Sequence, residues 1–382
     1  MPSTEMPKYL EVSKEIEARI SAGRWRGDQR MPAVREIADE YKVSVATASR
    51  ALQVLRDKGI ITSVERSGSY LVDGVEKSGH PWALCFCVTP GPWQNASYSI
   101  TLSGFEALAR REGFSFAADA INLENAITSR DIARQVKHAI GAGIKGLFFL
   151  PSRISVESME RDRMLLAHCR DAGLPVVLIE RNLRGDSREL ECDLVGPDDV
   201  GGGQRLAEHL QEIGRRKIAF VRGCSTSSHN DRLAGYLFAQ FKGGDTDSPD
   251  ARPRAPHVLE FRHDLPGKKA YSLLADQIVE DGIDGIICFQ DITAIGLIVE
   301  LLARGRRIPH DVAVAGFDDL PIGNSFSVGV TTYALDAERI AQHALRMMYE
   351  RIKKPRTPPV HVVVPGRLIV RESTCASPSA GE

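Results

Sequence analysis

The amino-acid sequence predicts an α/β protein in which a small N-terminal helical domain precedes two doubly wound parallel-sheet lobes. The chain has 382 residues, which is long for a single domain. Its first 72 residues show helical periodicity followed by a short hairpin pattern. From Trp82 onward, short continuous apolar runs alternate with amphipathic segments, which indicates βα units in parallel sheets that helices cover on both faces.

The segment Pro32–Lys58 predicts two short helices joined by a tight turn. Pro32 suits the first turn of a helix, where a missing N–H costs nothing. The apolar residues of the first helix recur at helical spacing: Val34, Ile37, Ala38 and Tyr41. Ser44 is a good N-cap for the second helix. The buried stripe of the second helix is expected to contain Ala48, Ala51, Leu52 and Leu55.

The opposite face of the second helix is small, polar and cationic. It carries Thr47, Ser49, Arg50 and Gln53. Small hydroxyl side chains let a helix approach the edges of DNA bases, and Arg50 can reach a phosphate or a guanine. The segment is therefore a candidate helix-turn-helix, and a helical hairpin inside a globular core is the alternative.

The flanking residues extend this motif. Residues 7–22 predict a helix with one apolar side, formed by Tyr9, Val12, Ile16 and Ile20. Residues 60–72 predict a two-stranded hairpin, so the order of elements is that of a winged helix. Residues 1–72 hold 12 Lys and Arg against 10 Asp and Glu, whereas the whole chain has a net charge of −1. This slight positive excess permits contact with DNA but does not require it.

Composition and residue spacing exclude several classes of protein. The N-terminus has no basic run followed by an apolar core, and no apolar run approaches the roughly 20 residues of a membrane helix. The seven cysteines are odd in number and scattered, which predicts buried thiols in a reducing cytoplasm. The ten histidines show no metal-ligand spacing, so no metal or cofactor is predicted.

Residues 73–81 are polar and contain Gly and Pro, which predicts a linker between a DNA-binding domain at 1–72 and a two-lobed domain at 82–374. The apolar runs predicted as buried strands of the two lobes are Trp82–Val88, Gly146–Leu150, Val176–Glu180, Lys217–Val221, Gly285–Phe289 and Val312–Phe317. Polar or acidic residues follow several of these runs. Since ligands of doubly wound folds bind at the carboxyl ends of the strands, a cleft between the lobes is expected there.

Three motifs in the larger domain do not fit the chemistry that they suggest. Gly141–Gly146 matches a dinucleotide-binding spacing but follows a predicted helix and precedes a strand, which is the wrong order. Gly201–Gly203 opens a helix without the Lys and Ser or Thr of a phosphate loop. Cys224–His229 contains nucleophile and base residues without a nucleophile elbow, so it is interpreted as a ligand-side loop.

Short motifs in residues 1–72 resemble the GntR-type winged helix: Pro7-Lys8-Tyr9, Gly23, Asp28–Pro32, Arg35-Glu36, Val43-Ser44 with Thr47, and Gly68-Ser69-Tyr70. The resemblance implies DNA contacts from the first helix of the motif, from the start of the recognition helix and from the wing tip. These residues are Arg35; Ser44, Val45, Ala46, Thr47 and Ser49; and Arg66 and Ser67. The family often has Arg at the positions of Val45 and Ser49. The run Val43–Arg50 is also similar to the recognition helix of LacI-type repressors, which gives Arg50 a larger share of the binding.

Segments at the predicted strand ends resemble the effector domain of LacI/GalR-type regulators, a fold shared with periplasmic sugar-binding proteins. They are Val176–Arg181, Asp231–Tyr236, Phe289–Asp291 and Gly316–Asp319. The resemblance covers nearly all of residues 82–372. It implies a small carbohydrate effector held by Tyr98, Ser152, Glu180, Arg181, Arg232, Gln290 and Asp318. On this basis we expect Arg232 and Asp318 to face one another across the same sugar.

A GntR-type reader joined to a LacI/GalR-type sensor is the architecture of arabinose-responsive repressors. The resemblance implies a cytoplasmic homodimer that binds double-stranded operator DNA and responds to a small sugar, such as arabinose or another pentose. Two alternatives are a sugar-processing enzyme and a transport-type sugar-binding protein, each with an accessory DNA module. The missing acid/base pair and phosphate loop speak against the enzyme, and the missing signal peptide speaks against the transport protein.

Overall fold

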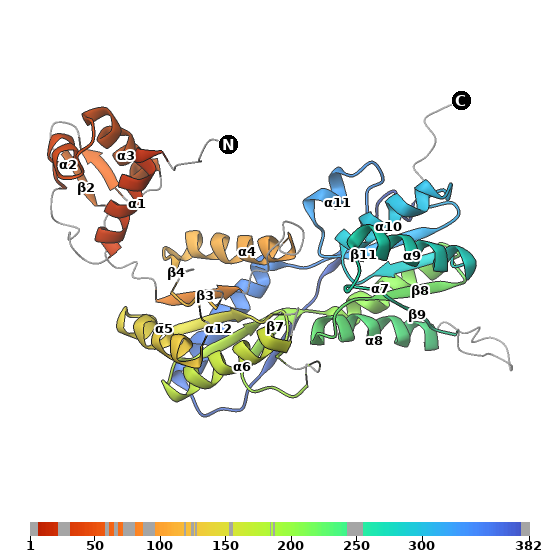
Figure 1. Ribbon diagram of the computed structural model, residues 1–382. Coiled ribbons are helices and arrows are strands. Elements are labelled where there is room, and N and C mark those ends of the chain that lie inside the picture. Colours follow the sequence, from red (N-terminus) through yellow and green to blue (C-terminus); the bar gives the residue numbers. More distant parts are fainter. Residues whose placement is uncertain are drawn as a thin grey trace. The chain divides into compact units, whose positions relative to one another are not determined.

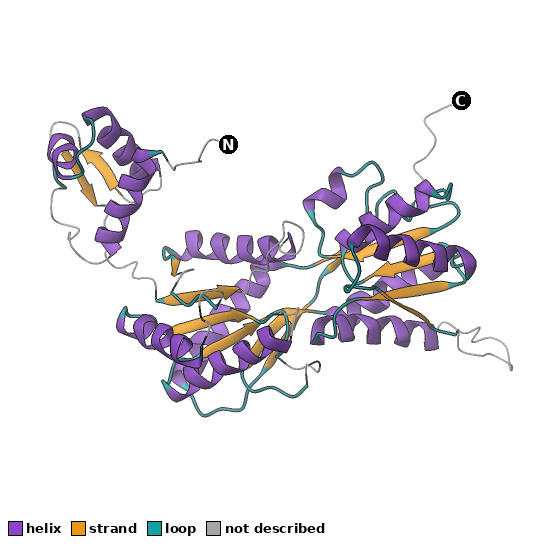
Figure 2. Cartoon of the chain, in the orientation of Figure 1, coloured by secondary structure: helices purple, strands orange, loops and turns teal. Residues whose placement is uncertain are grey.

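The computed structural model describes residues 7–21, 31–57, 61–64, 68–71, 81–86, 96–117, 120–123, 126, 128–152, 156–183, 185, 188–242 and 255–375 (Figures 1 and 2). The chain divides into two compact units: residues 1–81 with 113–115, and residues 82–112 with 116–382. The predicted linker lies outside the described residues, apart from Pro81. No helix in the described ranges is both long and apolar enough to cross a membrane.

Three helices and a hairpin form the N-terminal unit: α1 (Lys8–Ser21), α2 (Val34–Glu40), α3 (Val45–Asp57), β1 (Ile61–Val64) and β2 (Gly68–Leu71). The hairpin is antiparallel, with Ile61 opposite Leu71. The predicted apolar stripes of the three helices meet in one core, and every predicted stripe residue is buried or half-buried. Because α2 has only seven residues, its stability depends on this packing rather than on helix propensity.

The two helices of the motif begin at residues whose backbone donors are satisfied. Ser44 Oγ accepts a hydrogen bond from the Thr47 N–H at 3.1 Å, as expected of an N-cap. Pro32 precedes the first helix instead of lying in its first turn, because Ala33 is the N-cap residue and α2 starts at Val34. The Glu36 carboxylate accepts the Ala33 N–H at 2.6 Å and satisfies a donor that the helix leaves unpaired.

The first lobe of the larger unit is a six-stranded parallel sheet in the order β13-β7-β6-β5-β3-β4. Its strands are β3 (Trp82–Phe86), β4 (Phe116–Ala117), β5 (Gly146–Leu150), β6 (Val176–Ile179), β7 (Asp193–Pro197) and β13 (His361–Val364). Its helices are α4 (Ala96–Glu112), α5 (Ser129–Gly141), α6 (Val156–Asp171) and α12 (Ala337–Lys353). Helices α5 and α6 pack on one face of the sheet, and α4 and α12 cover the other (Figure 1).

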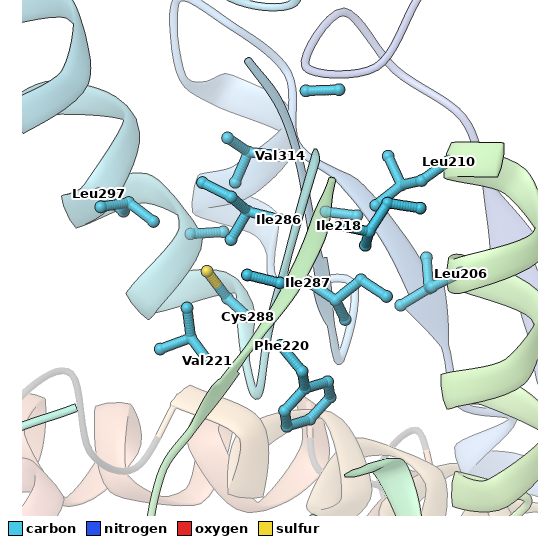
Figure 3. Close-up of a cluster of buried hydrophobic side chains, with 14 of the residues drawn as sticks. Leu206, Leu210, Ile218, Phe220, Val221, Ile286, Ile287, Cys288, Leu297 and Val314 are labelled. Carbon is cyan, nitrogen blue, oxygen red and sulfur yellow. The ribbon is translucent and has the colours of Figure 1, made fainter. Parts of the chain in front are cut away.

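The second lobe has the strand order β14-β12-β11-β10-β8-β9, in which only β14 is antiparallel to its neighbour within the described sheet. Its strands are β8 (Ile218–Arg222), β9 (His257–Glu260), β10 (Gly285–Cys288), β11 (Ala313–Phe317), β12 (Thr331–Ala334) and β14 (Arg367–Ile369). Its helices are α7 (Asp199–Glu212), α8 (Ser227–Lys242), α9 (Gly267–Glu280), α10 (Asp291–Ala303) and α11 (Pro321–Ser325). Figure 3 shows Leu206 and Leu210 of α7 on one side of the sheet and Leu297 of α10 on the other.

The chain passes between the two lobes three times, after Pro197, after Ala334 and after Val364. The crossings lie beside one another. The Asp198 N–H donates to the Val364 carbonyl at 2.9 Å, and the Gly366 N–H donates to the Tyr333 hydroxyl at 3.0 Å. The three crossings therefore form one junction between the lobes.

Glycines allow α7 and α8 to pack backbone against backbone. A Cβ on Gly203 would lie 2.0 Å from the Arg232 carbonyl oxygen, and a Cβ on Gly235 would lie 1.9 Å from that of Val200. The predicted helix exists but begins at Asp199, two residues before the run Gly201–Gly203, and Gly203 of that run serves this close approach. The contact fixes the position of α8, and therefore of Arg232, relative to the junction.

Replacing Gly235 with Ala is expected to destabilise the second lobe by about 1–3 kcal/mol, because the new methyl group has no space against α7. Gly141→Ala is the matched control: Gly141 ends α5 and has nothing within 4 Å of the added Cβ, so that variant should be neutral or gain up to about 1 kcal/mol. Urea denaturation of the full chain measures both. Equal stability of the two variants would contradict the close-packing argument.

Candidate functional site

The candidate DNA-reading surface is the first two turns of α3 with the exposed face of α2. Arg35, Ser44, Val45, Ala46, Ser49 and Arg50 are exposed, and Thr47 is half-buried. The structure thus leaves these predicted residues outside the hydrophobic core of the unit. The predicted wing-tip residues Arg66 and Ser67 lie outside the described residues.

Hydroxyl groups and one guanidinium on this surface already make contacts within the N-terminal unit. The Ser44 hydroxyl lies 2.8 Å from Thr47 Oγ1 in addition to capping the helix. The Arg50 guanidinium lies 4.5 Å from the centre of the Tyr9 ring on α1, a cation–π contact. Sequence reasoning missed the role of Tyr9, because it assigned this side chain only to the core-facing stripe.

Apart from Tyr98 and Arg232, which lie on helices α4 and α8, the candidate effector residues lie just after strand ends. Glu180 follows β6 in the first lobe, Gln290 follows β10 and Asp318 follows β11 in the second. Glu180 and Asp318 have positive φ values of 64° and 97°, which place non-glycine residues in a region that they rarely adopt. Such local strain occurs at binding sites, where the surrounding fold holds side chains in set directions.

Arg232 is the centre of the second-lobe group. Only 6% of this residue is exposed, and each nitrogen of its guanidinium donates to a different acceptor. Nε donates to Asp199 Oδ1 at 2.7 Å, Nη1 to the Phe289 carbonyl at 2.7 Å, and Nη2 to Asp318 Oδ1 at 3.0 Å. Arg232 and Asp318 therefore bond to each other directly, with the arginine buried among carboxylates, and contact of both side chains with one sugar stays a prediction.

Burial controls the protonation of this group. Burial raises the pKa of Asp199 to about 7, against the lowering effect of Arg232. Burial works to lower the pKa of Arg232, but the charges of Asp199 and Asp318 outweigh it and raise that pKa well above the usual value. Burial, followed by the charge of Asp318, also raises the pKa of Asp291 well above its usual range. The group therefore gathers three carboxyl groups around one permanent cation, and burial favours the protonated forms of Asp199 and Asp291.

The first-lobe group is a second buried arginine with its own carboxylate. Arg181 is 1% exposed; its Nε donates to the Pro151 carbonyl at 2.9 Å, and its Nη2 lies 4.0 Å from Glu180 Oε2. Its guanidinium lies 5.5 Å from the centre of the Tyr98 ring. Glu180 also accepts a hydrogen bond from the Thr101 hydroxyl, and its charge contributes to the raised pKa of Arg232. Glu180 therefore connects the two groups electrostatically.

The remaining predicted residues have distinct surroundings. Gln290 is half-buried at the N-cap position of α10, and its side chain makes no capping hydrogen bond. The Ser152 backbone N–H donates to Asp162 at 2.6 Å, so a carboxylate in the same lobe holds this strand end.

The described part of the chain contains no cluster of His, Cys, Asp or Glu that could hold a metal. A surface hollow of about 500 Å³ beside Arg134 and His138 contains none of the predicted site residues.

Sequence reasoning missed Asp199 and the contacts that join the lobes near the site. The Asn182 N–H donates to Ser227 Oγ at 2.9 Å, and the Asn230 amide donates to the Gly185 carbonyl at 2.8 Å. Asp199 follows β7, whose sequence is not a continuous apolar run. Its proximity to Arg232 depends on helix packing that residue spacing does not reveal.

Asp199 should make the stability of the protein depend on pH. The ordinary pKa of an aspartate is 3.8, and burial raises that of Asp199 to about 7 in the folded protein, so between these values the folded state holds the extra proton and rising pH destabilises it. The wild type should lose about 2–3 kcal/mol of unfolding free energy relative to Asp199→Asn as pH rises from 5 to 7, because the variant has no proton to release at this position. Glu280→Gln, at an exposed position of α9, should parallel the wild type. Parallel curves for Asp199→Asn and wild type would contradict the assignment.

Two family descriptions match the chain. "Periplasmic binding protein-like domain" matches residues 207–374, and "Bacterial regulatory proteins, gntR family" matches residues 8–71. Over 381 residues the chain is 23% identical to the arabinose metabolism transcriptional repressor of Geobacillus stearothermophilus, which covers 98% of this chain and 99% of that protein. It is 30% identical over 217 residues to the HTH-type transcriptional regulator CelR of Thermobifida fusca, covering 56% of this chain and 61% of that protein.

Solved structures show the same fold. The transcriptional regulator CelR–cellobiose complex matches with a TM-score of 0.60 at 22% identity, over 98% of this chain and 100% of that chain. A LacI family transcriptional regulator from Enterococcus faecium with bound ribose matches with a TM-score of 0.57 at 20% identity, over 77% of this chain and 98% of that chain. The chain thus joins a DNA-binding domain of the GntR family to an effector domain of the periplasmic-binding-protein-like, LacI/GalR type, and it is a transcriptional regulator.

Proposed function

We propose that this regulator is a homodimeric, cytoplasmic repressor whose affinity for operator DNA is controlled by a small, uncharged sugar. Arabinose or another pentose is the first candidate, because one relative that matches over almost its whole length is a repressor of arabinose metabolism and another is a ribose operon repressor. The observation that carries the proposal is the convergence of polar strand ends from both lobes, Glu180 from one and Gln290 and Asp318 from the other.

The charges of this group favour an uncharged ligand. Arg232 has two carboxylates as direct partners, and Arg181 has Glu180 beside it. A ligand carboxylate or phosphate would therefore meet cations that are already compensated, next to further acids. Hydroxyl groups instead offer both donors and acceptors, which match carboxylate oxygens and the Gln290 amide.

The proposed mechanism links the ligand to the junction between the lobes. Arg232 connects Asp318 at the candidate site to Asp199 at the start of α7, directly after a lobe crossing. Closure of the lobes on a sugar would shift this junction and so change the spacing of two DNA-binding domains in a dimer. The ligand acts only to the extent that it binds the two arrangements with different affinity.

A dimer suits the DNA-binding domain. One winged helix makes a small interface with DNA, whereas a two-fold pair matches the two half-sites of a near-palindrome. Sedimentation and footprinting test this part: monomers that protect one asymmetric half-site would remove it.

Gln290→Ala should weaken the effector response without changing the stability of the free protein, because this half-buried amide makes no capping bond. We expect about 10–100-fold more sugar to be needed for the same thermal shift. The measurement is a thermal-shift titration with arabinose, ribose and cellobiose, and Gln277→Ala on the exposed face of α9 is the control. If no sugar stabilises the wild type, the sugar proposal fails; if Gln290→Ala responds like the wild type, the site is misplaced.

Arg50→Ala should weaken binding to all DNA sequences to a similar degree and lower the slope of log affinity against log salt by about one. The reason is that Arg50, which is held against Tyr9, is placed to contact a phosphate. Arg205→Ala, an exposed arginine of α7, should leave the slope unchanged. A variant at Arg50 that loses discrimination between sequences but keeps the wild-type slope would show a base contact instead.

A further inference from the structure

The recognition helix begins with an exposed apolar residue. Val45 is the first residue of α3 and is 51% exposed, outside the core that the other apolar residues of the unit form. Ala46 and Ser49 beside it are also exposed and small. A branched apolar side chain in this place adds nothing to the folding of the domain, since the core is complete without it.

The polar groups near Val45 are engaged in holding the helix. The Ser44 hydroxyl accepts the Thr47 N–H at 3.1 Å and lies 2.8 Å from the Thr47 hydroxyl. These contacts use the Thr47 N–H and one of the two hydroxyl protons to hold the start of the helix, a cap worth about 1 kcal/mol. One hydroxyl proton remains for a base, so the pair keeps part of its hydrogen-bonding capacity.

Arg50, the exposed cation of α3, is also held by a contact within the domain. Arg50 lies against the Tyr9 ring of α1, 4.5 Å from the ring centre to the guanidinium carbon. This contact restrains the guanidinium toward α1. Beside two partly engaged hydroxyls, the first turn of α3 thus presents one exposed branched apolar side chain, that of Val45.

We infer that Val45 reads the C5-methyl group of a thymine in the major groove. This methyl group is the apolar feature that a standard base pair displays there, and aliphatic side chains recognise it by contact. The small side chains of Ala46 and Ser49 leave room for the helix to approach the base closely. The inference rests on the proposed binding of operator DNA and adds the chemical group that the protein recognises.

The test removes the methyl group from the DNA and the valine from the protein. A duplex that the full-length chain enriches from a random pool is synthesised with each thymine replaced in turn by deoxyuridine, which lacks only the C5-methyl group. At one thymine in each half-site, the replacement should weaken binding of the wild type about fourfold, the effect of burying one methyl group. Val45→Ala, which removes the contact in both half-sites of the dimer, should bind the thymine duplex about 16-fold more weakly and should respond to that replacement by less than twofold.

Arg35→Ala is the control, because an exposed cation on α2 contributes to affinity without contacting the methyl group. The affinity of Arg35→Ala should fall equally for the thymine and deoxyuridine duplexes, so that the ratio of its affinities for the two duplexes stays about four. Val45 is largely exposed, so Val45→Ala should keep the circular dichroism and melting temperature of the wild type. The inference is overturned if every thymine can be replaced with less than a twofold effect, or if Val45→Ala keeps the fourfold penalty. Failure to enrich any duplex would instead refute operator binding itself.

Discussion

The buried guanidinium of Arg232 is the interaction on which the larger unit depends. Removing such a charge from water costs several kcal/mol, and only well-placed acceptors offset that cost. Here the acceptors come from three separate segments: the start of α7, the end of β10 and the end of β11. The arginine itself comes from α8, so one side chain fixes the relative positions of four segments at the carboxyl edge of the sheet.

The glycines of α7 and α8 make that arrangement possible. With side chains at Gly203 and Gly235, the two helices would stand further apart and Arg232 would not reach Asp199 in its present geometry. The rare backbone conformation at Asp318 then directs its carboxylate toward the same arginine. Packing, backbone strain and charge pairing in this lobe are parts of one arrangement, and the proposed sugar site is built on it.

The elements that carry a strong local pattern could be predicted from the sequence. The apolar stripes of α1, α2 and α3 and the six apolar runs correspond to helices and buried strands in the structure, within one to two residues at most ends. β7 and β12 could not be predicted in this way, since Asp193–Pro197 and Thr331–Ala334 are not continuous apolar runs. The polar residues that follow the strands could be recognised in the sequence, but the residues that form hydrogen bonds or ion pairs with them could not. Asp199 meets Arg232 across 33 residues of chain and Tyr9 meets Arg50 across 41, so both pairings depend on tertiary packing.

The local cap of the recognition helix has a consequence for how such a regulator could change during evolution. Because the cap engages Ser44 and Thr47 and the core excludes Val45, Ala46 and Ser49, substitutions at these three exposed positions leave the folding of the domain almost untouched. Changes at Arg232 or Asp318, in contrast, leave a buried charge without its partner. After gene duplication, a copy of this protein could therefore acquire new target genes by single surface substitutions, whereas acquiring a new inducer through these two residues would require coordinated changes in the interior.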